Sequence, residues 1–354
     1  MSPAKTPRTW SLCVTLPAFL LNVWIVMPAP AQVLALLAVP LTEGWSLWTS
    51  LVALLTLLLV PSELRRSSRS RVLTSLVVGV LAVCCGLVPL FAAQRLAALH
   101  QVELSVWDAA TAVLEGRSAV PRETVAFMQL PGGGELLMDV YGASAPDTRV
   151  PVVIIHGGGW HARDKSDFPR FNAWLVSQGY AVFDVQYRLD PQPNWREALG
   201  DVKCAMGVVA QQAQRFNIDA SRMVLLGRSA GAHLALMAGY TTGHPQLAPS
   251  CAVEDVKPTH VVEIYGPTDL VWSFYNPTNR LVYDGPANLQ RFLGGTPDDV
   301  KDRYVLMSPV THVTPGSPAT LLIHAGTDQF VNPFHMRFLE WQLLPAGVKH
   351  KVLY

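Results

Sequence analysis

Charge is scarce in this 354-residue chain, and neither sign is in excess. Only 15% of the residues are charged, and 27 Lys and Arg against 26 Asp and Glu leave a net charge of +1. Without a basic surplus or a basic repeat the chain has no surface that attracts a polyanion, so we expect no nucleic-acid partner. Half of the residues are apolar, and this surplus is concentrated in roughly the first 92 positions.

Cysteine is also sparse, and the spacing of the cysteines matches neither a zinc site nor a disulfide framework. Three of the five lie in apolar N-terminal segments. The other two, Cys204 and Cys251, could pair only if the fold brings them together, which nothing in the sequence leads us to expect. The sequence contains no internal repeat, and we expect neither a metal nor a cofactor.

Three apolar blocks with almost no charge fill residues 11–39, 45–60 and 72–92. The last is long enough to cross a hydrocarbon core of ~30 Å at ~1.5 Å per helical residue. The first contains three prolines and is either one kinked span or a tight pair of helices. A cleaved signal peptide could explain the first block alone, and a buried helical domain of a soluble protein is the other alternative. We predict a transmembrane anchor of about three spans in residues 1–92.

The basic residues around these blocks predict the orientation of the anchor. Lys5 and Arg8 precede the first block, and only Glu43 marks the connection between the first two. Four arginines fill the connection to the third block: Arg65, Arg66, Arg69 and Arg71. Because basic loops stay in the cytoplasm, everything after about Ala93 is predicted to be extracytoplasmic, in a multi-pass membrane protein with the lipid bilayer as a partner. Residues 93–123 have the spacing of an amphipathic connector, which either packs on the following domain or lies at the membrane surface.

Residues 124–354 alternate short apolar strands with amphipathic helices, which predicts an α/β domain with a mainly parallel sheet and helices on both faces. The first two strands flank Pro131-Gly132-Gly133-Gly134 and form a hairpin. Strands are expected at 125–130, 135–141, 150–155, 180–187, 222–226, 260–265, 319–324 and 350–354, and helices at 168–178, 195–215, 230–240 and 333–344.

The segment Gly227-Arg228-Ser229-Ala230-Gly231 lies between an expected strand and an expected helix. In this setting a G-x-S-x-G sequence is typical of a nucleophile elbow, in which a sharp turn exposes the serine hydroxyl. Ser229 is therefore the candidate nucleophile. The alternative is a glycine-rich turn without chemistry.

A second motif, His156-Gly157-Gly158-Gly159-Trp160, follows another expected strand. Glycines let backbone N–H groups approach a substrate, so Gly158 and Gly159, together with Ala230, are the predicted oxyanion donors. A glycine loop without an oxyanion is the alternative. We expect His156 to hold the loop by hydrogen bonds and Trp160 to form a wall of the substrate pocket.

The predicted acid is Asp328, which follows the strand at 319–324 and can orient an imidazolium. Asp269 is the alternative, although we expect it to cap a turn. In the chain order nucleophile, acid, histidine, only His335 and His350 follow Asp328, and neither is well placed to reach Ser229. The domain at 124–354 is therefore expected to lack the C-terminal end that carries the histidine, or to be a degraded enzyme.

These motifs resemble the α/β-hydrolase superfamily, in particular the esterase branch related to hormone-sensitive lipase and to the BD-FAE and isoprenylcysteine-methylesterase-like proteins. The resemblance covers about residues 124–354. It implies Ser229 as nucleophile, Asp328 as acid and the glycine loop as oxyanion hole. It also implies that Arg188 and Asp201 are framework residues. The sequence departs from the family at Arg228, in the absent histidine and in the predicted anchor. The quoted segments are HGGGW at 156–160, Tyr187-Arg188-Leu189, Asp201, GRSAGAHLA at 227–235, Tyr265-Gly266-Pro267-Thr268-Asp269 and Gly326-Thr327-Asp328.

The sequence thus predicts a membrane-anchored serine hydrolase that cleaves carboxylic esters through an acyl-enzyme on Ser229. Residues 272–292 are expected to be an insertion over the pocket. Its aromatic residues indicate an ester with an apolar or lipidic portion, unless they serve only for packing. An amidase or peptidase on the same scaffold and a catalytically dead, membrane-tethered binding module are the alternatives.

Overall fold

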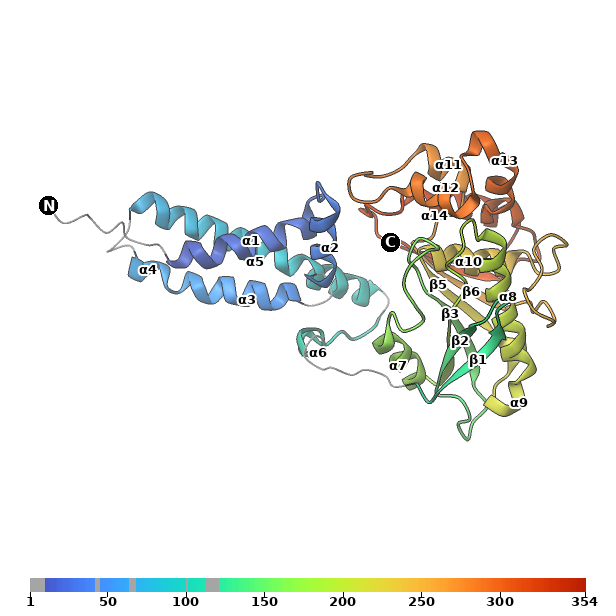
Figure 1. Cartoon of the computed structure of the whole chain (residues 1–354). Coiled ribbons are helices and arrows are strands. Elements are labelled where there is room, and N and C mark those ends of the chain that lie inside the picture. The colour runs from blue at the N-terminus through green and yellow to red at the C-terminus, as the bar shows by residue number, and fades with distance from the viewer. Residues whose placement is uncertain (1–9, 42–44, 64–67, 100, 112–120) are drawn as a thin grey trace. The chain divides into compact units, whose positions relative to one another are not determined.

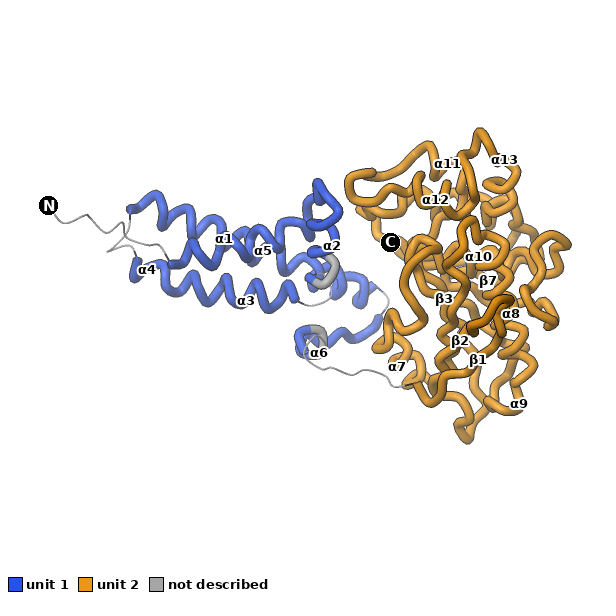
Figure 2. The backbone as a smooth tube through the Cα atoms, viewed as in Figure 1, with its two compact units in different colours: residues 1–117 blue, residues 118–354 orange. Residues whose placement is uncertain are grey.

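The computed structural model describes residues 10–41, 45–63, 68–99, 101–111 and 121–354. The chain forms two compact units, Met1–Arg117 and Ser118–Tyr354 (Figures 1 and 2). The division falls within the connector predicted for residues 93–123. Among the charges used to predict orientation, Lys5, Arg8, Glu43, Arg65 and Arg66 lie outside the described residues.

The N-terminal unit is helical. Its first apolar block forms two helices rather than one kinked span, because a break containing Pro28 and Pro30 separates them. The third block lies within α5, which continues beyond position 92 into the predicted connector. Within the described residues α5 is the one helix long and apolar enough to cross a membrane, while α1 and α3 are shorter apolar helices. The helices are α1 (Trp10–Val26), α2 (Gln32–Pro40), α3 (Ser46–Leu57), α4 (Val60–Glu63), α5 (Arg69–Leu99) and α6 (Val106–Thr111).

Helices α1, α3 and α5 pack with small and polar side chains inside and large apolar side chains outside. Asn22 on α1 is fully buried, donates to Ala82 O and accepts from Thr49 Oγ1. The buried positions include Ser11, Thr15, Ala18, Asn22, Ala53, Ser75 and Ala82. The exposed positions include Leu16, Leu20, Leu51, Leu55, Leu73, Val77 and Leu81. This arrangement is the reverse of that in a water-soluble helical bundle.

The described residues of Ser118–Tyr354 form one eight-stranded sheet in the order β1-β2-β4-β3-β5-β6-β7-β8 (Figure 1). The β1–β2 and β2–β4 pairs are antiparallel, and the other pairs are parallel. The strands are β1 (Glu123–Gln129), β2 (Glu135–Tyr141), β3 (Val150–Ile155), β4 (Tyr180–Val185), β5 (Val224–Arg228), β6 (His260–Ile264), β7 (Ala319–Ile323) and β8 (His350–Leu353). The predicted strand order along the chain and the mainly parallel sheet are thus confirmed.

Helices cover both faces of this sheet. Strand β3 shows why, because its residues alternate between two separate apolar cores. Val153 and Ile155 pack in the larger core with residues of α8 and α10, while Val152 and Ile154 pack with Leu175 of α7. The helices are α7 (Pro169–Ser177), α8 (Trp195–Gln211), α9 (Ala213–Phe216), α10 (Ala230–Tyr240), α11 (Leu270–Tyr275), α12 (Gly285–Leu293), α13 (Pro297–Leu306) and α14 (Phe334–Leu343). The sequence patterns did not predict α11–α13.

Cys204 and Cys251 form a disulfide that was not expected from the sequence, and their Cα atoms are 5.5 Å apart. Cys204 lies on α8, and Cys251 lies in the irregular segment between α10 and β6. The neighbouring Lys203 explains how this segment reaches α8. Its fully buried ammonium group donates to Thr241 O and to Leu247 O, both at 2.7 Å, and pairs with Asp255 at 2.9 Å. These contacts bring together residues 47 positions apart, which no local sequence pattern can indicate.

Candidate active site

Strand β5 ends at Arg228 and α10 begins at Ala230, so Ser229 alone makes the turn between them. Its φ of 54° and ψ of −122° are unusual for a residue with a side chain and cost about 1–3 kcal/mol. The Ser229 N–H donates to Ile264 O at 2.9 Å, and its C=O accepts from His233 N–H at 3.1 Å. Both backbone groups of Ser229 are therefore fixed by the neighbouring strand β6 and by α10.

The two flanking glycines are required by close backbone contacts. A Cβ at Gly227 would overlap Gly231 O, and a Cβ at Gly231 would overlap the carbonyl oxygens of Ile155 and His156. The G-x-S-x-G pattern is thus the sequence consequence of a turn pressed against the end of β3. This is the geometry that the sequence predicted for Ser229.

The glycine loop runs directly beside the serine. A Cβ at Gly157 would lie 3.4 Å from Ser229 Cβ. Gly158 and Gly159 have φ values of +111° and +61°, and a Cβ at Gly158 would overlap Ala162 O. The N–H groups of Gly158 and Gly159 donate to no other described residue. The N–H of Ala230, as the first residue of α10, also has no intrahelical partner.

His156 stabilises this loop, as the sequence predicts. Its Nδ1 lies 2.7 Å from Gly157 O, and its ring stacks on Tyr187 with 4.4 Å between the ring centroids. Tyr187 Oη donates to His156 O at 3.2 Å. Burial lowers the pKa of His156, so the ring is neutral at physiological pH and acts as a structural group.

Trp160 is 3% exposed and lines the pocket into which Ser229 opens. Its Nε1–H donates to His233 Nδ1 at 3.2 Å, while His233 Nε2 lies 2.7 Å from Met307 O. These contacts require a neutral imidazole with its proton on Nε2, and burial lowers the pKa of His233 to about 4. His233 thus ties the glycine loop to α10, a role that no sequence pattern around it indicates.

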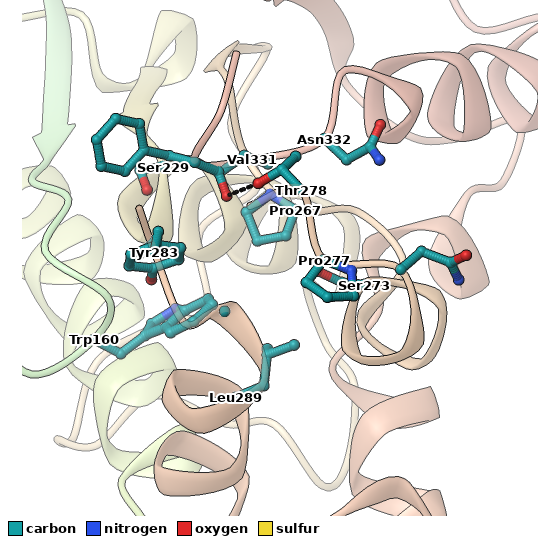
Figure 3. A pocket seen from close by; sticks show the side chains of 14 residues that line it. Trp160, Ser229, Pro267, Ser273, Pro277, Thr278, Tyr283, Leu289, Val331 and Asn332 are labelled. Carbon is teal, nitrogen blue, oxygen red and sulfur yellow. Dashed lines mark hydrogen bonds between the residues drawn. The ribbon is translucent and has the colours of Figure 1, made fainter. Parts of the chain in front are cut away.

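Ser229 opens into a narrow pocket with a cavity volume of about 30 Å³ (Figure 3). Trp160 and Ala230 line it from the glycine loop and the elbow, and Tyr283 lines it from the segment predicted to be an insertion over the pocket. Thr278 Oγ1 donates to Gln329 O, and its longer contact with Phe330 O, at 3.5 Å, is the dashed line in Figure 3; both contacts join that segment to the loop after β7.

Asp328 lies in the loop after β7, and both of its carboxylate oxygens are hydrogen-bonded. Oδ1 accepts from Phe330 N–H at 2.7 Å and from Val331 N–H at 3.1 Å. Oδ2 lies 3.3 Å from His324 Nε2, a contact that was not predicted from the sequence. Phe330 and Val331 line the pocket and Asp328 does not. The carboxylate therefore holds its loop in place.

His324 and Glu263 form a buried polar group with Asp328. Burial tends to lower the pKa of His324, but the hydrogen bond to Asp328 and the charges of Glu263 and Asp328 outweigh it and raise that pKa. Burial raises the pKa of Glu263 to about 7. Glu263 Oε2 and His324 Nδ1 are both buried and have no partner among the described residues.

The remaining histidines after Asp328 stay away from the pocket. His335 is fully buried, and its Nδ1 accepts from Thr268 N–H at 3.1 Å. His350 begins β8, and its Nδ1 lies 2.8 Å from Val348 O. Asp269 accepts from Trp272 N–H at the start of α11, which is the capping role expected of it. Among the described residues that line the pocket, none is a histidine.

Arg188 and Asp201 form the framework pair that the family resemblance implies. Asp201 is fully buried and accepts from Arg188 Nε at 2.8 Å and Nη2 at 2.6 Å. Arg228 makes no ion pair with any described residue, and its guanidinium instead packs over the rings of Phe168 and Phe171 at 4.1 and 5.0 Å. Its side chain thus secures the end of β5 against the start of α7.

The His324–Asp328 contact predicts a pH-dependent stability. The folded-state pKa of His324 is raised. The His324–Asp328 pair therefore stabilises the folded protein fully at pH values below the unfolded-state pKa of His324, and this stabilisation is lost as the pH rises through the folded-state pKa. His324→Gln should therefore lower the melting temperature of the full chain more at pH 6 than at pH 9. A hydrogen bond to a charged group contributes about 1.5–3 kcal/mol to the free energy of unfolding, which sets the size of the effect expected at pH 6.

Thermal unfolding of the detergent-solubilised protein, followed by tryptophan fluorescence, measures this difference. His350→Gln is the matched control and should show the same small effect at both pH values, because His350 has no carboxylate partner among the residues that the structure describes. An effect of His324→Gln that is equal at pH 6 and pH 9 would contradict the assignment.

Comparison with known proteins agrees with this geometry. The model of the BD-FAE family matches residues 138–343. Esterase LipQ of Mycobacterium tuberculosis (strain ATCC 25618 / H37Rv) is 28% identical over 229 residues, covering 61% of this chain and 52% of the relative. Esterase LipC of the same organism is 29% identical over 199 residues, covering 54% of this chain and 48% of the relative. The chain spans about half the length of these curated relatives.

A third relative and two solved structures complete the comparison. Kynurenine formamidase of Salmo salar is 34% identical over 131 residues, covering 36% of this chain and 43% of the relative. The native esterase Est2 of Thermogutta terrifontis superposes with a TM-score of 0.54 at 21% identity, covering 68% of this chain and 81% of Est2. A truncated carbohydrate esterase from gut microbiota superposes with a TM-score of 0.53 at 20% identity, covering 67% of this chain and 88% of the esterase. The BD-FAE family model matches more than half of this chain, and the eight-stranded sheet, the elbow and the glycine loop agree with that match. The chain therefore belongs to the BD-FAE family and has the α/β-hydrolase fold.

Proposed function

We propose that this protein is a serine hydrolase that cleaves carboxylic esters through an acyl-enzyme on Ser229. One observation carries the proposal: the strained turn presents Ser229 directly beside a glycine loop whose N–H groups have no partner among the described residues. A nucleophile facing free backbone donors is the arrangement that acyl transfer requires. The names of the relatives LipQ and LipC, both esterases, support the same reaction class.

In the proposed reaction, Ser229 Oγ forms a bond to the carbonyl carbon of the ester. The carbonyl electron pair moves onto oxygen, and N–H groups of Gly158, Gly159 and Ala230 bind this oxyanion, each contributing ~10²–10³ in rate. The serine proton passes to an imidazole base and then to the departing alcohol. Water cleaves the acyl-enzyme by the same sequence of steps.

The base is proposed by chemical class only, as a histidine imidazole that reaches Ser229 Oγ, because the described pocket lining contains none. Asp328 is proposed as the carboxylate that orients this imidazole. That role requires the base to approach from the side of the loop after β7, where Asp328 is held by the N–H groups of Phe330 and Val331.

The pocket lining indicates the kind of ester. Trp160, Tyr283 and Phe330 offer aromatic surfaces, which suit an apolar portion of the substrate. Asn276 and Asn332 offer hydrogen-bonding groups on the same walls. From this lining we propose an ester with an apolar portion as the substrate.

Amide hydrolysis is the second candidate, and the similarity to a kynurenine formamidase favours it. The same nucleophile and oxyanion donors serve both reactions, but an amide needs stronger protonation of its leaving nitrogen. Rates on an ester and an amide with the same acyl group separate the two candidates. A protein that binds the ester without turnover would instead be the membrane-tethered binding module.

We further propose that helices α1, α3 and α5 form a multi-pass membrane anchor. The supporting observation is their reversed packing, with leucines outside and serine, threonine and asparagine inside. In water such an exposed apolar surface would be unfavourable, whereas in lipid it is expected. The Cys204–Cys251 disulfide supports the extracytoplasmic location proposed for Ser118–Tyr354, because disulfides persist in oxidising compartments.

The proposed nucleophile predicts a large effect of Ser229→Ala. Loss of the nucleophile should lower kcat on p-nitrophenyl acetate by at least about 10³-fold, leaving only oxyanion and binding effects. Steady-state hydrolysis by the full chain in detergent measures the change. Ser221→Ala, which removes an exposed hydroxyl that does not line the pocket, is the control and should retain the wild-type rate within a few-fold. Equal activity of the wild type and Ser229→Ala would exclude the mechanism.

The proposed anchor predicts that the full chain stays in the membrane fraction after extraction with alkaline carbonate. External protease applied to intact cells or spheroplasts should degrade the unit Ser118–Tyr354, because it is proposed to lie outside. Immunoblotting against that unit provides the measurement, with lysed cells as the positive control. Release of the protein from the membrane fraction by carbonate would argue against membrane-spanning helices. Protection of the unit Ser118–Tyr354 from protease in intact cells would contradict the proposed orientation.

A further inference from the structure

Tyr283 reaches the active site from a segment that is remote from both catalytic motifs. It lies between α11 and α12 and lines the same pocket as Ser229 and Trp160 (Figure 3). Its N–H donates to Asn279 O at 2.9 Å, and its C=O accepts from Gly285 N–H at 3.0 Å. The side chain therefore projects from a backbone turn that is already fixed at the start of α12.

The hydroxyl of Tyr283 has no hydrogen-bond partner among the described residues, although the Tyr283 ring packs beside Phe330 with 6.0 Å between the ring centroids. Tyr283 as a whole is half-buried, and its hydroxyl is not sealed from the pocket space. Burial raises the pKa of Tyr283 to about 12, so the hydroxyl keeps its proton at neutral pH. A protonated, unpartnered hydroxyl in a substrate pocket is available to donate to a ligand.

The position of Tyr283 Oη relative to the glycine loop identifies the atom it can reach. It lies 3.1 Å from the position that a Cβ would occupy at Gly159. Since N and Cβ of one residue are ~2.5 Å apart, Gly159 N lies within about 5.6 Å of Tyr283 Oη. Two donors that each bind one oxygen at ~2.9 Å can be up to about 5.8 Å apart. The distance between the two groups therefore allows one oxygen atom to lie within hydrogen-bond range of both.

We propose that Tyr283 is a catalytic residue whose hydroxyl donates a hydrogen bond to the substrate oxyanion, beside the N–H of Gly159. The inference rests on the proposed ester hydrolysis at Ser229. It adds a side-chain donor from the α11–α12 segment to the backbone donors of the glycine loop and the elbow. The segment predicted only as an apolar cover thereby supplies part of the oxyanion site.

Because the oxyanion forms with every ester, the contribution of Tyr283 should not depend on the leaving group. Tyr283→Phe removes the hydroxyl and keeps the ring. The variant should lower kcat/KM by about 10²-fold on both a p-nitrophenyl and an alkyl ester of the same acid. Affinity for a trifluoromethyl ketone analogue, whose adduct carries the same oxyanion, should fall in parallel.

The experiment uses the full chain in detergent, with Tyr275→Phe as the matched control. Tyr275 belongs to the neighbouring helix α11, donates to Asp298 at 2.8 Å on the surface and does not line the pocket, so its variant should keep the wild-type rate. An unchanged kcat/KM of Tyr283→Phe would overturn the inference. A loss confined to the alkyl ester would also overturn it, because it would place the hydroxyl on the leaving oxygen.

Wild-type and Ser229→Ala proteins measured in parallel separate this inference from the proposed function. Ester turnover by the wild type that depends on Ser229 but not on the Tyr283 hydroxyl would reject the inference alone. No turnover by the wild type would reject the proposed function, and with it the role of Tyr283.

Discussion

Ser229 has a positive φ, and two backbone hydrogen bonds hold it there. One comes from its N–H to Ile264 O on β6, and the other from His233 N–H on α10 to its C=O. Gly227 and Gly231 allow the turn to pack this closely, because a side chain at either position would overlap the neighbouring backbone. The backbone strain at Ser229 costs about 1–3 kcal/mol, and the packing of the sheet and of α10, which this turn joins, offsets it. Every other feature of the site is arranged around this turn.

The glycine loop depends on the same helix. Trp160, the last residue of the HGGGW motif, donates to His233, and His233 is also the residue whose N–H fixes the turn at Ser229. Ser229 and the glycine loop are thus held by two groups of a single residue on α10. The neutral tautomer of His233, favoured by complete burial, is what allows both its ring nitrogens to be satisfied at once.

Local motifs made much of this fold and site predictable from the sequence. The elbow, the glycine loop and the alternation of strands and helices depend on residues close together in the chain, so their patterns can be recognised directly. The Cys204–Cys251 pair, the His324–Asp328 contact and the place of Tyr283 beside Gly159 were not predicted. Cys204–Cys251 and Tyr283–Gly159 depend on distant segments meeting in space. His324 is only four positions before Asp328, but a lone histidine after a strand has no pattern that distinguishes it from a core residue.

A crystal structure of the full-length protein after reaction with a fluorophosphonate tests the central claim most directly. The account predicts a phosphorus atom bonded to Ser229 Oγ, with the phosphonyl oxygen ~2.7–3.1 Å from at least two N–H groups among Gly158, Gly159 and Ala230. An adduct on another residue would contradict it. So would a phosphonyl oxygen on Ser229 that points away from the glycine loop.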